Sequence, residues 1–123
     1  MARILVVDDA LFTRKTLSNI LEEEGYEIVG QADNAKDAIE VYGKVKPDLV
    51  TMDIIMPKME EIDAITAVQE IMKEDPHAKI VMISAMSQHS LVVKAIQAGA
   101  KGFITKPFHA SQVIEMVETV LRE

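Results

Sequence analysis

Residues 49–57, LVTMDIIMP, place one carboxylate, Asp53, inside an otherwise apolar run that ends at Pro57. The residues before Asp53 are mostly aliphatic or β-branched, which favours a buried β-strand. A carboxylate that loses its water without gaining a partner is energetically expensive. We therefore expect Asp53 to follow a buried strand and to lie close to other polar side chains.

Four further apolar runs of strand length are spaced along the chain, and the segments between them have the hydrophobic periodicity of helices. The predicted strands are residues 4–7, 28–32, 49–52, 80–83 and 103–104. The clearest helical stripes are Leu17, Ile20 and Leu21; Ala35, Ala38, Ile39 and Tyr42; Ile62, Ile65, Val68 and Met72; and Val113, Met116, Val117, Val120 and Leu121. Gly25, Gly43 and Gly99 fall near predicted helix ends, where positive φ is often required.

Alternating strands and helices predict a single α/β domain over residues 1–123, with a doubly wound, five-stranded parallel sheet and five helices. The runs around Val6, Val50 and Val81 are the most continuously apolar and are expected at the centre of the sheet. EIVGQA at 27–32 is interrupted, and GFIT at 102–105 is short, so both are expected at edges. These features predict strand order 2-1-3-4-5, the flavodoxin-like arrangement.

The composition limits the classes of function. Hydrophobic residues make up 49% and charged residues 27%, as in ordinary soluble proteins. No apolar run is long enough to cross a bilayer, so we expect a cytoplasmic protein without membrane contact. The absence of cysteine excludes disulfide and thiolate chemistry. The net charge of -7 argues against nucleic acid binding, so the expected partners are other proteins. The protein itself is expected to be a monomer.

Polar residues follow four of the five predicted strands. Asp8 and Asp9 follow the first, Asp53 the third, Ser84 the fourth and Lys106 the fifth. The carboxyl ends of parallel strands share one edge, and the first and third strands meet where the winding of the sheet reverses. Such folds bind ligands in the crevice at that point. The three aspartates are therefore expected to line a binding site.

Three carboxylates in one crevice require positive charge. Two of them repel by roughly 4 kcal/mol at 4 Å if the effective dielectric constant is about 20. Lys106 supplies one positive charge, so a divalent cation is expected, and oxygen ligands with few carboxylates suit Mg²⁺. Asp53 is then placed to attack phosphorus as a nucleophile. The cation and Lys106 would neutralise the phosphoryl oxygens, and Ser84 would donate a hydrogen bond.

Simpler roles are also open for these residues. Asp8 or Asp9 alone would more commonly cap the helix that follows. Ser84 or Lys106 alone would usually be a solvated surface residue. The three histidines share no metal-ligand spacing and are expected at the surface.

Four motifs together resemble the receiver domains of two-component response regulators, over essentially the whole chain. They are ILVVDD at 4–9, DLVTMDIIMP at 48–57, ISAM at 83–86 and AGAKGFITKPF at 98–108. The resemblance implies that Asp53 accepts a phosphoryl group from a phosphohistidine of a sensor histidine kinase. It further implies that Mg²⁺ is held by Asp8, Asp9, Asp53 and the backbone carbonyl of Ile55.

The same resemblance implies a conformational switch. Lys106 and Ser84 would bind the phosphoryl group, the Lys106-Pro107 bond would be cis, and Ser84 and Phe103 would move on phosphorylation. The surface of the fourth helix, fifth strand and fifth helix would then change. Because Phe103 lacks the hydroxyl of the tyrosine in some relatives, we expect a softer switch. Such a domain catalyses only its own phosphorylation and dephosphorylation.

The motifs are most similar to those of the stand-alone chemotaxis members of the family. This similarity implies a chemotaxis kinase upstream. It also implies an output partner at the flagellar switch or, in archaea, an adaptor to the motor. The alternatives are a receiver domain of a longer transcriptional regulator and an intermediate in a phosphorelay.

Two departures from the family pattern affect the site. Glu60 and Glu61 stand where the family usually has Asp-Gly or Asn-Gly. A residue with a side chain at positive φ there costs on the order of 1 kcal/mol, so the loop is either strained or follows another path. Ile55 and Met86 are apolar, whereas relatives have polar residues at these positions that help to orient the attacking water. We therefore expect slow loss of the phosphoryl group unless a phosphatase assists.

Two other classes of protein fit the sequence less well. A haloacid dehalogenase-type hydrolase carries a second acid two residues after its nucleophile, where this chain has Ile55. A flavin-binding flavodoxin needs a phosphate loop rich in glycine and hydroxyl groups after the first strand. The corresponding segment here, DDALFTR at 8–14, is acidic and would repel a phosphate that lacks its metal.

Overall fold

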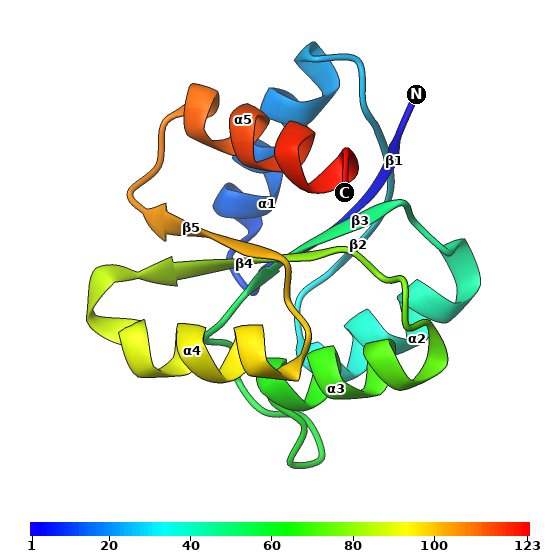
Figure 1. Ribbon diagram of the computed structural model, residues 1–123, viewed down its shortest axis with the longest axis vertical. Helices are drawn as coiled ribbons and strands as arrows, with labels where there is room; N and C mark the ends of the chain where they lie inside the picture. Colours follow the sequence, from blue (N-terminus) through cyan, green and yellow to red (C-terminus); the bar gives the residue numbers. More distant parts are fainter.

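The computed structural model describes all 123 residues and contains one parallel five-stranded sheet between two layers of helices (Figure 1). The strands are β1 (Arg3–Val7), β2 (Glu27–Ala32), β3 (Leu49–Asp53), β4 (Ile80–Ala85) and β5 (Gly102–Lys106). The helices are α1 (Leu11–Glu23), α2 (Ala35–Val45), α3 (Ala64–Glu74), α4 (His89–Ala98) and α5 (Ala110–Leu121), with a 3-10 turn, η1 (Met86–Gln88), before α4. The strand order is β2-β1-β3-β4-β5, so the predicted fold class is confirmed.

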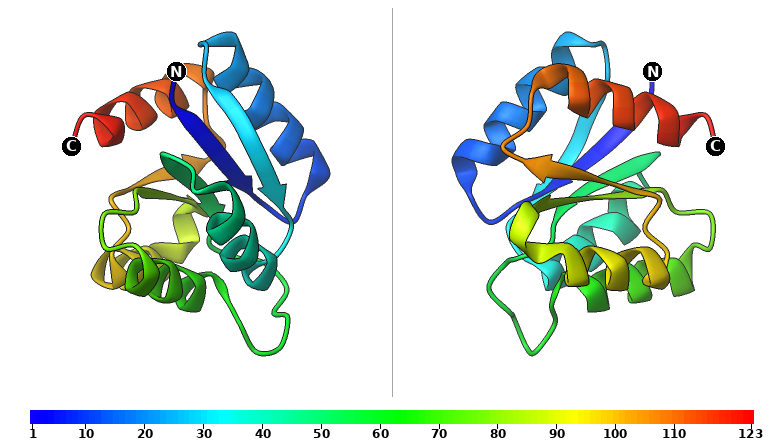
Figure 2. Two further views of the ribbon diagram at one scale, coloured as in Figure 1. Left: turned by 90° about the vertical axis from the view of Figure 1, so that its right-hand side faces the viewer. Right: turned by 60° about the vertical axis from the view of Figure 1, so that its left-hand side comes forward.

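The sheet is covered on both faces. Helices α2, α3 and α4 pack on one face, and α1 and α5 pack on the other (Figures 1 and 2). Successive residues of a strand point to opposite faces, so Val50 belongs to a core cluster of 20 residues and Leu49 to one of 11. Because both faces are covered, β3 is buried at every position, whereas the edge strands β2 and β5 are only partly buried.

Three strands extend further toward the carboxyl edge than predicted. β3 ends at Asp53, β4 continues to Ala85 and β5 ends at Lys106. Parallel pairing continues to these residues, with Asp53 opposite Ile83 and Ala85 opposite Lys106. The polar residues at these positions are therefore held by the sheet itself, which restricts their backbone more than a loop would.

The start of α3 differs from the sequence expectation. The helical stripe assigned from Ile62 begins two residues later, at Ala64, because Asp63 caps the helix. The carboxylate of Asp63 accepts a hydrogen bond of 2.8 Å from the backbone N–H of Thr66. Ile62 lies outside the helix and pairs with Met59 in an isolated bridge.

The glycines predicted at helix ends behave in two ways. Gly25 and Gly99 follow their helices with φ of 96° and 128°, as predicted. Gly43 instead lies inside α2, and Lys46, the residue that follows the helix, has the left-handed conformation with φ of 45°. The amide of Lys46 donates to the carbonyl of Tyr42, so the helix hydrogen-bond pattern continues past the glycine.

The loop between β3 and α3 stands out from the body of the molecule (Figure 2). Glu60 and Glu61 have φ of 55° and 63°, so the strained alternative for this loop is the one the structure adopts. No helix of the protein combines the length and apolar character needed to cross a membrane.

Candidate functional site

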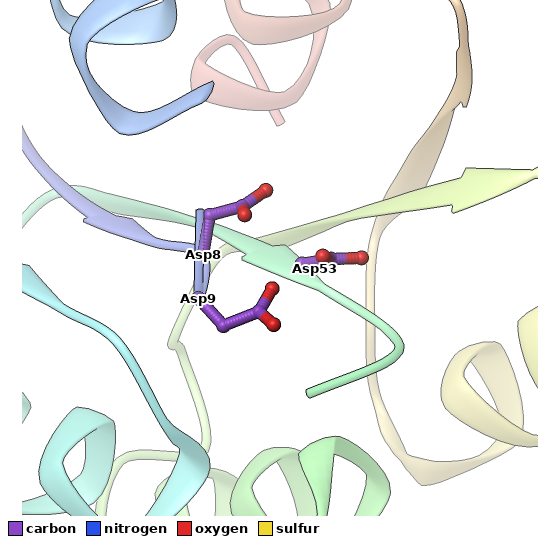
Figure 3. Close-up of side chains that lie close together, drawn as sticks. All are labelled: Asp8, Asp9 and Asp53. Carbon is purple, nitrogen blue, oxygen red and sulfur yellow. The ribbon is translucent and has the colours of Figure 1, made fainter. Parts of the chain in front are cut away.

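Three carboxylates meet at the carboxyl edge of the sheet. Asp8 and Asp9 come from the turn after β1, and Asp53 is the last residue of β3 (Figure 3). One oxygen of each carboxylate lies within 4.8 Å of the others. β1 and β3 are adjacent strands, and the winding of the sheet reverses between them. The predicted convergence of the three aspartates is confirmed.

The three acids differ in exposure. Asp8 is fully buried and Asp53 is 6% exposed, whereas Asp9 faces solvent. Oδ1 of Asp8 accepts a hydrogen bond of 2.9 Å from the backbone N–H of Ala10. Ala10 is the residue that precedes α1, and no side chain caps that helix. Neither aspartate therefore has the capping role that the sequence left open.

Lys106 brings the single positive charge into the cluster. Its Nζ lies 3.2 Å from Oδ2 of Asp53 and 3.4 Å from Oδ2 of Asp8. Burial acts to lower the pKa of this ammonium, but the charges of Asp53 and Asp8 outweigh burial, so the pKa of Lys106 is raised. Lys106 is therefore a cation at neutral pH and is shared between two acids.

One lysine does not balance this site. Burial raises the pKa of Asp53, the charge of Asp8 raises it further, and Lys106 offsets only part of the effect. The net direction shows that the ionised form of Asp53 is disfavoured by its surroundings. Additional positive charge at this edge would therefore stabilise the ionised cluster.

The donor set fits a hard divalent cation. All three side chains offer carboxylate oxygens, and no histidine belongs to the cluster. Oxygen ligands favour Mg²⁺, Ca²⁺ or Mn²⁺ over zinc. The exposed carboxylate of Asp9 leaves the cluster accessible from solvent. The acidic pocket therefore offers a hard cation three carboxylate ligands that are reached from solvent.

Ser84 and Phe103 lie on neighbouring strands at different depths. Ser84 is 2% exposed, next to the residue that pairs with Asp53. Phe103 is 45% exposed and lines an open cavity of about 350 Å³ between β5 and α5. Ser84 is thus at the acidic edge, whereas the Phe103 ring lies on the outer surface of β5.

The remaining predicted site residues lie around the pocket. Ile55 is about half exposed, and its backbone N–H donates to Oδ1 of Asp53 over 3.3 Å. Met86 follows Ser84 in the turn η1 and is 83% exposed. The peptide bond after Lys106 is cis, as the resemblance implies. The solvent-facing positions two residues after Asp53 and two residues after Ser84 are therefore both apolar.

The sequence reasoning did not identify Arg14. In the structure its Nη1 donates to the backbone carbonyl oxygen of Asp8 over 2.7 Å. A basic residue in the first turn of a helix that follows two acids was the signal available in the sequence. The acceptor of this hydrogen bond is a main-chain oxygen, so the pattern of side chains in the sequence could not predict the contact.

Comparisons with known proteins agree with this fold and show the family of the chain. Residues 4–118 match the response regulator receiver domain, and the chain belongs to this family. It is 53% identical to chemotaxis protein CheY of Thermotoga maritima, over 96% of each chain. It is 52% identical to chemotaxis protein CheY of Bacillus subtilis, over 97% of each.

A solved structure of the same family has the same fold. The CheX-CheY-BeF3-Mg complex of Borrelia burgdorferi contains a chain that is 39% identical, with a TM-score of 0.89. The match covers 97% of this protein and 88% of that chain. The protein is thus a response regulator with chemotaxis homologues, rather than a classical enzyme.

Proposed function

We propose that Asp53 accepts a phosphoryl group from a phosphohistidine of a sensor histidine kinase in a Mg²⁺-dependent reaction. The observation that carries this proposal is the meeting of Asp8, Asp9 and Asp53 with Lys106 at one edge of the sheet. We further propose that residues 1–123 form a single receiver domain that works as a cytoplasmic monomer.

Each group has a separate part in the transfer. A carboxylate oxygen of Asp53 attacks phosphorus, the P–N bond of phosphohistidine breaks, and the imidazole leaves with a proton from solvent. Lys106 interacts with the transferred oxygens, and Ser84 donates a hydrogen bond to one of them. Asp8, Asp9, Asp53 and the backbone carbonyl of Ile55 would hold Mg²⁺. When bound, that ion supplies the positive charge that the acids and the phosphoryl group both require.

The proposed switch connects this edge to the outer surface of β5. Ser84 moves toward the phosphoryl group, and the ring of Phe103 turns inward from its half-exposed position. Because Phe103 carries no hydroxyl, packing alone separates its two positions. The face formed by α4, β5 and α5 then changes shape and selects the output partner.

The chemotaxis homologues support a choice of partners. Two relatives that share about half of their residues with this chain are chemotaxis proteins. We propose a chemotaxis histidine kinase as the donor, and the flagellar switch or an archaeal motor adaptor as the output partner. The solved relative is in complex with CheX, so we propose a CheX-like protein as a further candidate partner.

The proposed phosphoacceptor can be tested directly. The protein is incubated with acetyl phosphate, with and without Mg²⁺, and its intact mass is measured. One phosphoryl group should appear only with Mg²⁺ and should be absent from Asp53→Asn. Asp48→Asn removes a carboxylate at the opposite end of the sheet and should be phosphorylated like the wild type. Phosphorylation of Asp53→Asn at the wild-type rate would refute the assignment.

The apolar rim predicts slow spontaneous dephosphorylation. Ile55 and Met86 are exposed and have no polar group to orient water. Replacing them together, as Ile55→Asn with Met86→Glu, should accelerate loss of the phosphoryl group measured after removal of the donor. Equal rates in wild type and double variant would contradict the proposal.

A second role is compatible with the family. A receiver domain of a longer transcriptional regulator, or an intermediate in a phosphorelay, would use the same chemistry at Asp53. Phosphotransfer separates these roles: a phosphorelay intermediate passes its phosphoryl group on to a histidine of a second protein, whereas a chemotaxis regulator binds its motor partner while phosphorylated.

A further inference from the structure

Arg14 joins the acidic turn to the edge strand of the sheet. It lies in the first turn of α1 and is half-buried. Its Nη1 donates to the backbone carbonyl oxygen of Asp8 over 2.7 Å, and its Nε donates to Oε1 of Gln31 in β2 over 3.2 Å. One guanidinium therefore contacts both the turn after β1 and the strand beside it.

The contact with Asp8 constrains both acids of the turn. The carbonyl of Asp8 belongs to the planar peptide that joins it to Asp9. The amide of Asp8 is already fixed, because it donates to the carbonyl of Ala32 over 3.1 Å. With that carbonyl held by Arg14, the peptide plane cannot rotate freely. The direction in which the chain leaves toward Asp9 is then set.

The geometry requires a guanidinium rather than positive charge alone. Its planar fork presents several N–H donors in fixed directions, whereas an ammonium on a flexible chain does not reproduce two such contacts together. Asp33 and Asp37 line a cavity of about 270 Å³ with Arg14, but neither forms an ion pair with it. The hydrogen bond to the Asp8 carbonyl is the shorter of the two that the side chain forms.

We infer that Arg14 is a positioning residue for the acidic cluster: by holding the peptide between Asp8 and Asp9, it aims both carboxylates at the cation site beside Asp53. This inference rests on the proposed function and assigns a residue to it that touches neither metal nor phosphoryl group. Groups that orient the ligands of a metal commonly contribute tenfold or more to its affinity.

Lys15 provides a matched control. It is the next residue of α1, carries the same formal charge, is exposed and forms no side-chain hydrogen bond or ion pair. A long-range electrostatic role would be lost in part with either residue. A positioning role would be lost only with Arg14.

The first experiment measures binding of Mg²⁺ alone by isothermal titration calorimetry on the full chain. Arg14→Lys and Arg14→Gln should both weaken binding by about tenfold. Lys15→Gln should leave binding nearly unchanged, because an exposed charge is screened by salt. The phosphorylation rate with acetyl phosphate should follow the same order when Mg²⁺ is limiting.

A second measurement needs no metal. The backbone N–H of Ala10 donates to Oδ1 of Asp8, so its hydrogen exchange reports the order of the turn. Exchange at Ala10 should accelerate in Arg14→Lys and remain unchanged in Lys15→Gln. Gln31→Leu keeps Arg14 but removes its contact with β2, and should give a smaller change of the same kind. This variant decides the question if Arg14→Gln does not fold.

The outcomes separate this inference from the proposed function. Wild-type affinity and wild-type exchange in Arg14→Lys would overturn the inference while leaving the phosphoacceptor assignment intact. Equal weakening by Lys15→Gln would also overturn it, in favour of a simple charge effect. A wild-type protein that binds no Mg²⁺ and accepts no phosphoryl group would overturn the proposed function and this inference with it.

Discussion

The two ends of the same sheet treat charge in opposite ways. At the amino end, the guanidinium of Arg3 donates to the carbonyls of Val45 and Lys46, and its backbone N–H donates to Asp48. The ammonium of Lys79 donates to the carbonyl oxygens of Leu121, the last residue of α5, and of Glu123 at the end of the chain. Each of these cationic side chains is therefore hydrogen-bonded to carbonyl oxygens, and the carboxylate of Asp48 accepts from a backbone N–H.

At the carboxyl end the balance is different. Three acids lie together with one lysine, which contacts only Asp8 and Asp53. These two acids are buried, and the pKa of Asp53 is raised by its surroundings. The loop beside them contains two glutamates at positive φ. Locally unfavourable features, such as unbalanced charge or strained backbone, are expected at a site where a bound ligand offsets their cost. The amino end stabilises the fold, and the carboxyl end retains a cost that binding can offset.

The largest expected difference between the two ends is their response to Mg²⁺. At a hundredfold excess over its dissociation constant, Mg²⁺ should raise the free energy of unfolding by about 2.7 kcal/mol, provided that the unfolded chain does not bind it. Asp9→Asn should reduce this gain, whereas Asp48→Asn at the amino end should retain it. Chemical denaturation across a magnesium titration measures the effect. A constant midpoint in wild type would remove the contrast between the ends.

The second prediction compares, in the absence of Mg²⁺, Lys106 at the carboxyl end of the sheet with Lys79 at the amino end. Lys106→Met removes the charged donor from Oδ2 of both buried carboxylates, Asp8 and Asp53, which should lower the free energy of unfolding by about 2 kcal/mol. Lys79→Met removes donors from carbonyls at the end of the chain, where water can replace them, and should cost about 1 kcal/mol. Denaturant titration of both variants gives the comparison. Equal losses would mean that the carboxyl end is no more demanding than the amino end.

The third prediction concerns an acid near the carboxyl edge that is locally satisfied. The pKa of Asp63 is lowered, chiefly because its carboxylate accepts a hydrogen bond from the backbone N–H of Thr66. A lowered folded-state pKa contributes stability above the unfolded value of about 3.9, and this stability is lost as the pH falls through the folded pKa. Asp63→Ala should therefore cost about 1 kcal/mol at pH 7. The difference from wild type should narrow below about pH 4.

The uncharged cap of α2 is the control for this pH effect. The side chain of Asn34 accepts from the backbone N–H of Asp37, with the same geometry and no titration. The amide Nδ2 of Asn34 also donates to the carboxylates of Asp33 and Asp37. Because the capping oxygen itself carries no charge, the loss in Asn34→Ala should narrow less than that in Asp63→Ala over the same pH range, as measured by urea denaturation. A loss that narrows equally in both variants would show that the charge of Asp63 is not responsible.

The smallest expected effect is relief of strain in the loop after β3. Glu61→Gly removes the steric cost of a left-handed residue, about 1–2 kcal/mol. Glycine also makes the unfolded chain more flexible, which favours unfolding and offsets up to about 1 kcal/mol of this gain. A net stabilisation of about 0.5 kcal/mol should appear as a higher denaturant midpoint. Glu70→Gly, inside α3, should be destabilising instead, and a similar loss for Glu61→Gly would contradict the strain.

Much of the site was predictable because it follows from strand topology. Asp8 directly follows β1, Asp53 ends β3 and Lys106 ends β5, and parallel strands bring such positions to one edge. The edge strands were predictable from their interrupted or short apolar runs. These signals are local, since each depends on a few residues around the strand end.

Other features were not predictable because they depend on contacts between distant segments. The register of β1 against β2 places Gln31 within reach of Arg14. The late start of α3 depends on the competition between the cap at Asp63 and the apolar periodicity from Ile62. Helix α2 continues past Gly43 because its apolar face is held in the core through Tyr42.

By itself the sequence determined the alternation of strands and helices, the order of the strands and the presence of acids at one edge. Hydrophobic periodicity and strand-end position carry that information without any knowledge of distances. Only the tertiary structure decided which acids are buried, which one faces solvent and that Arg14 holds the peptide between two of them. Burial and main-chain hydrogen bonds arise when separate segments pack together, so no single stretch of sequence contains them.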